Sequence, residues 1–269
     1  MKNIGSFVKR HGIKPTVSLL YIVPAVLLFV GIVMVFISMF KAPPTERTFH
    51  WVGIGILLLM IIILLIARVA ALPKYFFEMY ENGIKIIYKK DKTPNEEYCF
   101  DEISEIWHLA IDGGNKTTNL VFKPSDVDYK LISSKISDCK GLFRNLTEAV
   151  VKQLLPSKSA ALTHGERLVF PILVSGGEQV MTSEKAILPY FKQAKKEHLS
   201  LDRFSVFDGQ KTYALADVSE VVMDQPSVNI LINSIVGSTL YTQSYFSIGN
   251  ADLFMALMKD VVVGDKSSS

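Results

Sequence analysis

Cysteine and histidine are scarce in this chain, and the familiar signatures of enzymes are missing from it. The 269 residues include two cysteines and five histidines. The cysteines form no Cys-x-x-Cys pair and no two histidines lie within four residues of each other, so a zinc site is not expected. Neither a GxSxG motif, a P-loop nor an HExxH motif occurs. The sequence therefore offers no positive signal for a metal, a cofactor or catalysis, and we expect a protein that is not an enzyme.

A concentrated positive charge is lacking as well. The formal net charge is only +3, whereas nucleic-acid binding requires a strongly basic surface, so nucleic acid is excluded as an expected partner. The mean hydropathy of +0.28 is high for a chain in which 20% of the residues are charged. This apolar excess lies within residues 1–72, and the rest resembles an ordinary globular sequence.

Uninterrupted apolar sequence is abundant near the start of the chain. The run Val17–Phe40 contains no charged residue, and the run Trp51–Leu72 contains only Arg68. A bilayer core requires about 20 apolar helical residues, whereas a buried soluble helix would carry a polar stripe. A signal peptide would have a shorter apolar core, of about 7–15 residues, and a small-residue cleavage site. Because the link 41–50 is short and contains two prolines, we expect a transmembrane helical hairpin.

Lysine and arginine indicate how this hairpin is oriented. They cluster before the first run and after the second, while the loop between the runs contains only Lys41 and Arg47. The positive-inside rule then predicts a multi-pass protein of the cell membrane with both termini in the cytoplasm. Cys99 and Cys139 would lie in a reducing compartment, so a structural disulfide is not expected. This design suits a bacterial inner membrane.

The remainder of the chain consists of short segments with alternating polar and apolar residues, which are typical of antiparallel strands. In each half, several strands precede one amphipathic helix. The expected strands are 76–88 with a turn at Glu81-Asn82-Gly83, 98–109, 119–123, 129–133, 166–174, 199–207, 212–215, 229–232 and 240–247. The first helix, with apolar residues from Leu142 to Leu154, is expected to end before Pro156, and the second contains Leu253 to Val261.

Two segments from different halves resemble each other. Residues 98–106 (YCFDEISEI) and 213–221 (YALADVSEV) share Tyr, Ser and Glu and keep their apolar positions. The closing helices also match, since Leu142-Phe143 corresponds to Leu253-Phe254. Because order, spacing and terminal helix agree, an internal duplication is predicted.

The predicted fold class is α+β, mainly antiparallel β, after the hairpin. Its expected parts are a transmembrane hairpin at 1–74 (helices about 17–40 and 51–72), a first module at 75–156, a second module at 157–263 and a disordered tail at 264–269. The segment 157–198 departs from the simple order, because a lysine-rich stretch of helical composition there contains Pro189.

The succession of a strand, an Asn-Gly or Asp-Gly turn, a strand, the Tyr…Ser-Glu segment and a closing helix resembles bacterial membrane-anchored proteins with pleckstrin-homology-like (PH-like) domains. In these proteins a short helical hairpin commonly precedes the module. The resemblance covers residues 75–155 and 199–263. It implies tandem PH-like modules, each closed by a C-terminal helix, that recognise lipid headgroups or protein segments.

The side chains that suggest a surface site are four lysines close to the membrane in sequence, Lys85, Lys89, Lys90 and Lys92. Anionic lipid attracts such residues by about 1 kcal/mol each, so this turn is a candidate membrane-contacting surface. The alternative is an ordinary solvated loop, because Asp91, Glu96 and Glu97 dilute the charge.

Other polar residues are explained more simply by structure than by chemistry. The acidic pairs Glu102/Glu105 and Asp217/Glu220 occupy repeated positions, where solvated sheet faces account for them without acid–base catalysis. His108, beside Trp107, is expected to be a partly buried strand residue.

Two functions follow as hypotheses. The first is a non-enzymatic, membrane-anchored cytoplasmic binding or scaffold module that recognises lipid headgroups or a protein partner, for instance by strand addition. The second is a membrane stress or defence component, such as an immunity protein, that acts through the hairpin itself, where Gly31, Gly53 and Gly55 would permit close helix packing.

Overall fold

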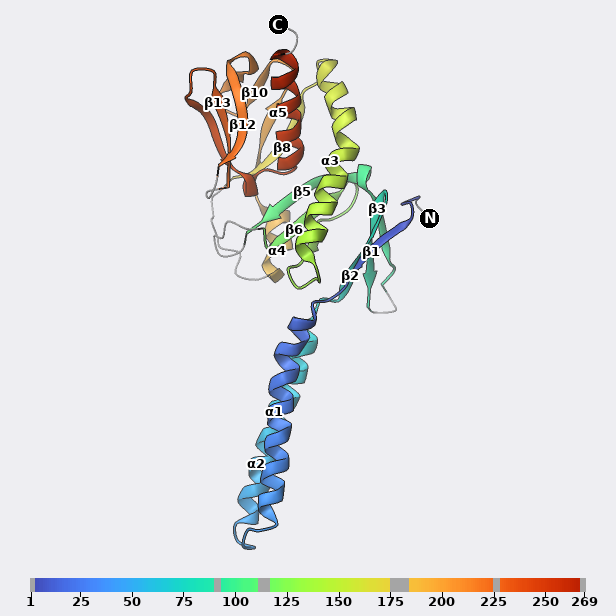
Figure 1. The fold of residues 1–269 in the computed structure, drawn as a ribbon, viewed down its shortest axis with the longest axis vertical. Helices are drawn as coiled ribbons and strands as arrows, with labels where there is room; N and C mark the ends of the chain where they lie inside the picture. Colours follow the sequence, from blue (N-terminus) through green and yellow to red (C-terminus); the bar gives the residue numbers. More distant parts are fainter. Residues whose placement is uncertain (1–2, 90–92, 111–116, 175–183, 225–227, 267–269) are drawn as a thin grey trace.

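A helical hairpin projects from one end of a folded body in the computed structural model, which describes residues 3–89, 93–110, 117–174, 184–224 and 228–266 (Figure 1). Its helices are α1 (Pro15–Met39) and α2 (Arg47–Ala71). Both are long and apolar enough to cross a membrane, and only 6% of the residues in their most apolar windows are buried. Such exposure distinguishes them from the core helix of a soluble domain. The two predicted apolar helices are thus confirmed, each beginning slightly earlier than expected.

The residues before the hairpin form a strand that the sequence did not suggest. Strand β1 (Phe7–His11) pairs antiparallel with β2 (Tyr75–Tyr80), which follows the hairpin. The sheet expected to begin at residue 75 therefore also includes residues 7–11. The chain enters and leaves the hairpin from neighbouring strands, and the rest of the chain lies at that end (Figure 1).

The first half contains two antiparallel sheets and a helix. One sheet has the order β1-β2-β3-β4 and the other the order β5-β6-β7. The remaining elements of this half are β3 (Gly83–Tyr88), β4 (Glu96–Cys99), the 3₁₀ turn η1 (Phe100–Glu102), β5 (Ile103–Leu109), β6 (Asn119–Pro124), β7 (Lys130–Ile132) and α3 (Cys139–Thr163). The hairpin turn predicted at residues 81–83 lies at residues 81–82, between β2 and β3, because Gly83 is already the first residue of β3. Alternate apolar side chains of both sheets and one face of α3 enclose a core that includes Phe77, Ile84, Ile103, Phe122, Leu142 and Leu146.

Helix α3 does not end before Pro156, and that prediction was wrong. The helix continues to Thr163 with Pro156 inside it. A proline inside a helix removes one hydrogen bond and disturbs the preceding turn. Packing compensates for this loss, because Leu162 is buried in the core of the second half and the Ser159 hydroxyl donates to Asp260 of the C-terminal helix.

The second half has the same order of elements. Its sheets are β11-β10-β9-β8 and β12-β13-β14. The elements are β8 (Leu168–Leu173), α4 (Glu184–Gln193), β9 (Lys196–Leu201), β10 (Ser205–Phe207), β11 (Thr212–Ala214), η2 (Leu215–Asp217), β12 (Val218–Asp224), β13 (Asn229–Ser234), β14 (Thr239–Ser244), η3 (Tyr245–Ser247) and α5 (Ala251–Lys266). The antiparallel sheets and the C-terminal helix agree with the predicted class.

Two boundaries of the second half differ from expectation. The strand predicted at 199–207 is divided into β9 and β10, because the Asp202 side chain accepts hydrogen bonds from the amides of Phe204 and Ser205 and so stabilises a turn. Helix α5 continues to Lys266, so residues 264–266 of the expected tail are helical, while residues 267–269 lie outside the described part of the chain. Pro189 lies inside α4.

The two halves share a local irregularity. Ser104 interrupts the register of β5 with β6, and Ser219 interrupts the register of β12 with β13. In each case the serine hydroxyl donates to a main-chain carbonyl of the facing strand, that of Lys123 or of Asn233. Each segment thus has a β-bulge at the matched position, with the same serine hydrogen bond. Residues 98–106 and 213–221 therefore resemble each other in local structure as well as in sequence.

A third apolar cluster joins the halves. The face of the β5-β6-β7 sheet that points away from the first core packs against α4 and β8. Its members are Trp107, Leu109, Val121, Tyr129, Leu131, Leu173, Ile187 and Phe191. Because this sheet is covered on both faces, β5 and β6 are apolar at consecutive positions rather than at alternate ones.

Candidate functional site at the membrane-facing end

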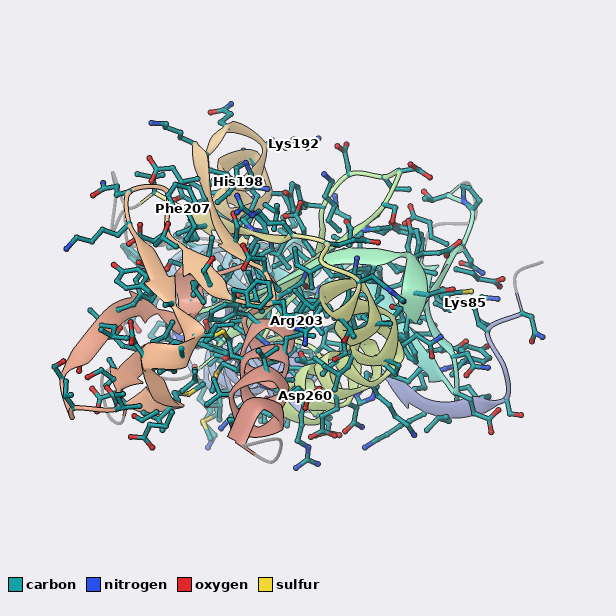
Figure 2. All side chains as sticks on the ribbon, turned by 90° about the horizontal axis from the view of Figure 1, so that it is seen from above. Lys85, Lys192, His198, Arg203, Phe207 and Asp260 are labelled. Carbon is teal, nitrogen blue, oxygen red and sulfur yellow. The ribbon has the colours of Figure 1, made fainter. Side chains whose placement is uncertain are left out.

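The four lysines singled out in the sequence do not form one surface in the described part of the chain. Lys85 lies in the middle of β3, is only 19% exposed, and its Nζ is 2.6 Å from a carboxylate oxygen of Glu97. Viewed along the hairpin axis, it lies on the outer side of the first half (Figure 2). Lys89 is exposed just after β3. Lys90 and Lys92 lie outside the described residues.

Lys89 and two further lysines lie together where the chain meets the hairpin. Lys14 directly precedes α1, Lys74 follows α2 by three residues, and the amide of Lys89 donates to the carbonyl of Lys74 at 2.9 Å. The pairing of β1 with β2 holds these strand ends side by side. We call Lys14, Lys74 and Lys89 the membrane-facing lysines. Within the described residues, the ion pairs involve none of the three.

A pocket of about 480 Å³ opens between the first half and α4. Tyr75 and Tyr88, from the ends of β2 and β3 nearest the hairpin, form part of its lining, and Leu188 of α4 lies in the opposite wall. At the mouth, Lys192 Nζ is 2.8 Å from a carboxylate oxygen of Asp128. We call this cavity the tyrosine pocket.

Glu96 orders one side of the tyrosine pocket. Its carboxylate accepts hydrogen bonds from the hydroxyls of Tyr88 and Tyr98 at 3.0 and 2.6 Å, and Lys130 Nζ lies 2.6 Å away. Burial alone would raise the pKa of Glu96, but the bonds from Lys130 and the two tyrosines outweigh it and hold the pKa below the usual value. Because Lys130 and Lys192 each have a carboxylate partner, the pocket has no excess charge of its own. Among the described residues at this end, the three membrane-facing lysines carry positive charge that no ion pair balances.

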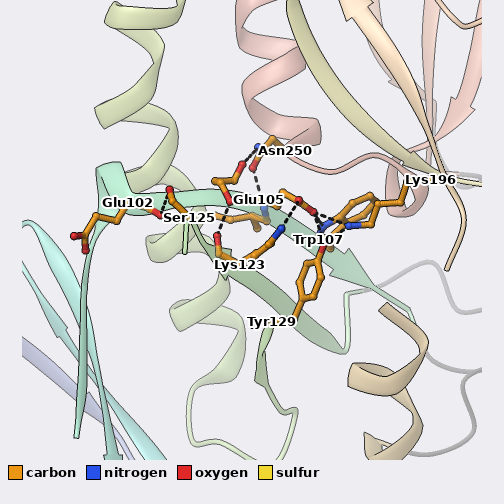
Figure 3. A network of polar contacts seen from close by, with 10 residues as sticks. Glu102, Glu105, Trp107, Lys123, Ser125, Tyr129, Lys196 and Asn250 are labelled. Atoms are coloured by element: carbon orange, nitrogen blue, oxygen red, sulfur yellow. Dashed lines mark hydrogen bonds and ion pairs between the residues drawn. The ribbon is translucent and has the colours of Figure 1, made fainter. Parts of the chain in front are cut away.

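Glu105 is largely buried between the two halves rather than solvated, so the prediction for this acidic residue was wrong. Its side chain is 15% exposed, and one oxygen accepts from Trp107 Nε1 at 2.9 Å and from the Tyr129 hydroxyl at 2.8 Å. Lys196 of β9 lies 3.1 Å from that oxygen (Figure 3). Burial alone would raise the pKa of Glu105. The hydrogen bonds from these donors and the charge of Lys196 outweigh the effect of burial, so the pKa lies below its usual value. The ionised carboxylate thus ties the first half to the second.

His108 belongs to the same interface. It is buried in β5, as expected, and its Nε2 lies 3.2 Å from a carboxylate oxygen of Asp252 in the first turn of α5. The Tyr245 hydroxyl donates to the same oxygen at 2.7 Å. Burial raises the pKa of Asp252, but the bonds from His108 and Tyr245 outweigh it and lower the pKa overall. Among the described residues, no three His, Cys, Asp or Glu side chains are arranged to hold a metal ion.

Some of these residues had a signal in the sequence and others had none. Lys14 and Lys74 flank the apolar runs, which is the signal that oriented the hairpin. Lys196 and Asp252 lie far along the chain from Glu105 and His108, so their proximity could be found only from the fold.

Comparison of the chain with protein-family models, with curated proteins and with solved structures found no match in any of the three.

Proposed function

We propose that this chain is a non-enzymatic binding module, anchored in the cell membrane by its hairpin, that recognises anionic lipid headgroups with the membrane-facing lysines. The observation that carries the proposal is the pairing of β1 with β2 on either side of the hairpin. This pairing fixes Lys14, Lys74 and Lys89 at the level where two membrane-length helices begin and end. The folded body is thereby held against the bilayer with these three lysines toward the headgroups.

The arrangement of the halves supports a tandem PH-like architecture. Each half has a four-stranded sheet, a 3₁₀ turn, a three-stranded sheet and a closing helix, in that order. The hairpin lies between the first two strands of one half, and α4 lies between the first two strands of the other. We infer a duplicated module with different insertions at one site. Such a fold hosts many functions, so the lysines, and not the fold, carry the lipid proposal.

The proposed location is the cytoplasmic face of the membrane. Both ends of the hairpin join one folded body, so the chain before α1 and the chain after α2 lie on the same side. The excess of lysine and arginine at these ends, compared with Lys41 and Arg47 in the loop, favours the cytoplasm. The inner leaflet is also where anionic lipids are concentrated.

Lipid retention by the full-length protein tests the proposal. The protein is extracted from a membrane of equimolar phosphatidylglycerol and phosphatidylethanolamine, and the bound lipids are counted by native mass spectrometry. At about 1 kcal/mol for each lysine, changing Lys14, Lys74 and Lys89 to Gln together weakens the preference for phosphatidylglycerol by up to about 100-fold. The matched control changes Lys152, Lys211 and Lys259, which are exposed elsewhere on the body, to Gln. Equal retention by the two triple variants would refute the proposal.

The hairpin offers a second candidate function, that of a defence or immunity component acting inside the bilayer. An apolar groove of about 590 Å³ crosses its two helices, lined by Pro24, Leu27, Leu28, Met60, Ile63 and Leu64. A groove of this kind suits another transmembrane helix. Filling it by Leu28→Trp would then abolish protection against a membrane-acting toxin while leaving the lipid preference unchanged. Protection that survives Leu28→Trp would rule this function out.

A further inference from the structure

A second pocket, of about 400 Å³, lies where α3 passes the beginning of α5. This volume falls in the usual range for small-molecule sites, about 300–1,000 Å³. The buried side chains of His108 and Thr147 line its inner part, while Lys140 and Arg144, one turn apart on α3, are exposed at its edge. Thr117 also contributes a hydroxyl to the lining. We call this cavity the α3 pocket.

Hydrogen-bond donors predominate among these groups. Thr117 Oγ1 lies 3.4 Å from His108 Nδ1, and Thr147 Oγ1 lies 3.3 Å from His108 Nε2. Each hydroxyl has one donor hydrogen and two acceptor lone pairs, so it can contact a ligand as well as His108. Arg144 adds a planar fork of N–H groups, and Lys140 adds a mobile ammonium. Two hydroxyls and two cations therefore converge on one small cavity.

Two carboxylates also border the α3 pocket, and each is already engaged. Asp252 accepts hydrogen bonds from Tyr245 and interacts with His108. Glu148 lies one turn after Arg144, with 4.0 Å between Arg144 Nε and the carboxylate, and both side chains are more than two-thirds exposed. Such an exposed pair is weak, so an anionic ligand can displace Glu148 from Arg144. The cations thus remain available to a ligand.

We propose that the α3 pocket binds a phosphate monoester. A monoester has a charge of about −1.5 to −2 and three acceptor oxygens, which match the two hydroxyls and the two cations better than a carboxylate does. Arginine forms bidentate bonds with phosphate, and lysine acts as a point charge beside it. The proposal does not depend on the membrane-facing lysines, which lie outside this cavity.

Two sources can supply this group. The main-chain amide of Ser137, two residues before α3, donates to the carbonyl of Gly12 near the start of α1. The α3 pocket therefore lies close to the bilayer surface as well as to the solvent. A lipid with a monoester headgroup, phosphatidic acid, and a soluble phosphate ester share the same chemistry, and the experiment has one arm for each.

The full-length protein is reconstituted in phosphatidylcholine nanodiscs and titrated with glycerol 3-phosphate by calorimetry. In the second arm, protein extracted from a mixture of phosphatidic acid and phosphatidylglycerol is analysed for retained lipid. Arg144→Gln removes a charge-assisted bond and is expected to weaken binding at least about tenfold in the arm that shows it. Thr117→Val removes a hydroxyl without a change of charge and is expected to weaken binding as well. Lys152→Gln, two turns further along α3, is the matched control and leaves binding unchanged.

Binding in the first arm identifies a soluble ester, and selective retention of phosphatidic acid in the second identifies a lipid. Absence of binding in both arms, or equal effects of Arg144→Gln and Lys152→Gln, would overturn the proposal. The lipid proposal for the membrane-facing lysines is tested separately, because it concerns phosphatidylglycerol, a diester that Arg144→Gln leaves unaffected.

Discussion

The main-chain amide and carbonyl of Ile106 both bond to Asn250, which lies 144 residues further along the chain. The amide donates to Asn250 Oδ1 at 2.8 Å, and the Asn250 amide donates to the Ile106 carbonyl at 2.8 Å. Asn250 Nδ2 also donates to the carbonyl of Ser104 (Figure 3). One residue of the second half therefore satisfies the outer edge of β5, as a neighbouring strand would.

Replacing Asn250 is expected to weaken the contact between the two halves. Asn250→Ala leaves the Ile106 amide and the Ser104 carbonyl without their partner and places Ala at a φ of +58°, so the free energy of unfolding should fall by about 2–4 kcal/mol. Asn250→Gly keeps the backbone conformation but loses the side-chain bonds. Its free energy of unfolding should therefore lie between those of the Asn250→Ala variant and the native chain. Denaturant unfolding of the full chain in detergent micelles measures both. Asn233→Ala, which removes exposed surface bonds, is the control. If Asn250→Gly were as stable as the native chain, the bonds to β5 would have no role.

The largely buried pair of Glu105 and Lys196 predicts a loss of stability in acid. The pKa of Glu105 in the folded chain is lowered from the ordinary 4.5, so its contribution is complete above pH 4.5 and is lost as the pH falls through the folded value. Glu105→Gln removes this acid dependence. At neutral pH the same change leaves the Lys196 ammonium largely buried without its carboxylate, and should lower the free energy of unfolding by about 3 kcal/mol.

The matched control for Glu105→Gln is Glu220→Gln, at the corresponding position of the second half. Glu220 is exposed and accepts one bond from Asn233, so this change should alter stability by less than about 0.5 kcal/mol. Both variants are followed by denaturant unfolding from pH 3 to 7. An equal effect of the two substitutions would contradict a special role for the buried pair.

Leu162 tests whether α3 stabilises the second half beyond Pro156. This leucine is buried in the core formed mainly by the second half, so Leu162→Ala should lower the free energy of unfolding by about 2–5 kcal/mol. Val169→Ala removes a side chain that is 55% exposed and should change it by less than about 0.5 kcal/mol. Hydrogen exchange of β12 and β13 reports which half is affected. Unchanged protection of these strands in Leu162→Ala would show that the end of α3 contributes nothing there.

The helical hairpin and the order of the strands could be predicted from sequence because they depend on local patterns. A long run of apolar residues predicts a helix of membrane-spanning length, and Asn82-Gly83 between alternating segments predicts a turn. The matched segments around Ser104 and Ser219 were also recognisable, since their core positions repeat. Predicting these features requires no knowledge of which helices and strands contact one another.

The missed features all depend on partners that are distant in sequence. Strand β1 is five residues long, and its partner follows the whole hairpin, so no local pattern distinguishes it from a basic flank. Pro156 normally ends a helix, and only packing of Leu162 against the second half favours continuation. Glu105 has a solvated counterpart in Glu220, and only the docking of β9 and α4 onto the β5-β6-β7 sheet buries it.

His11 predicts a second, milder pH dependence. Its side chain in β1 is fully buried, Nδ1 lies 3.3 Å from the carbonyl of Ser137, and Nε2 has no hydrogen-bond partner among the described residues. Burial lowers its pKa from 6.5, with a smaller opposing effect of Ser137. The unfolded chain therefore binds a proton first as the pH falls below 6.5, and the free energy of unfolding should decrease from pH 7 to 5. His11→Gln should flatten this part of the curve, whereas His164→Gln, at an exposed position, should not. If the His11→Gln curve kept the slope of the native chain between pH 5 and 7, the buried imidazole of His11 would not be its cause.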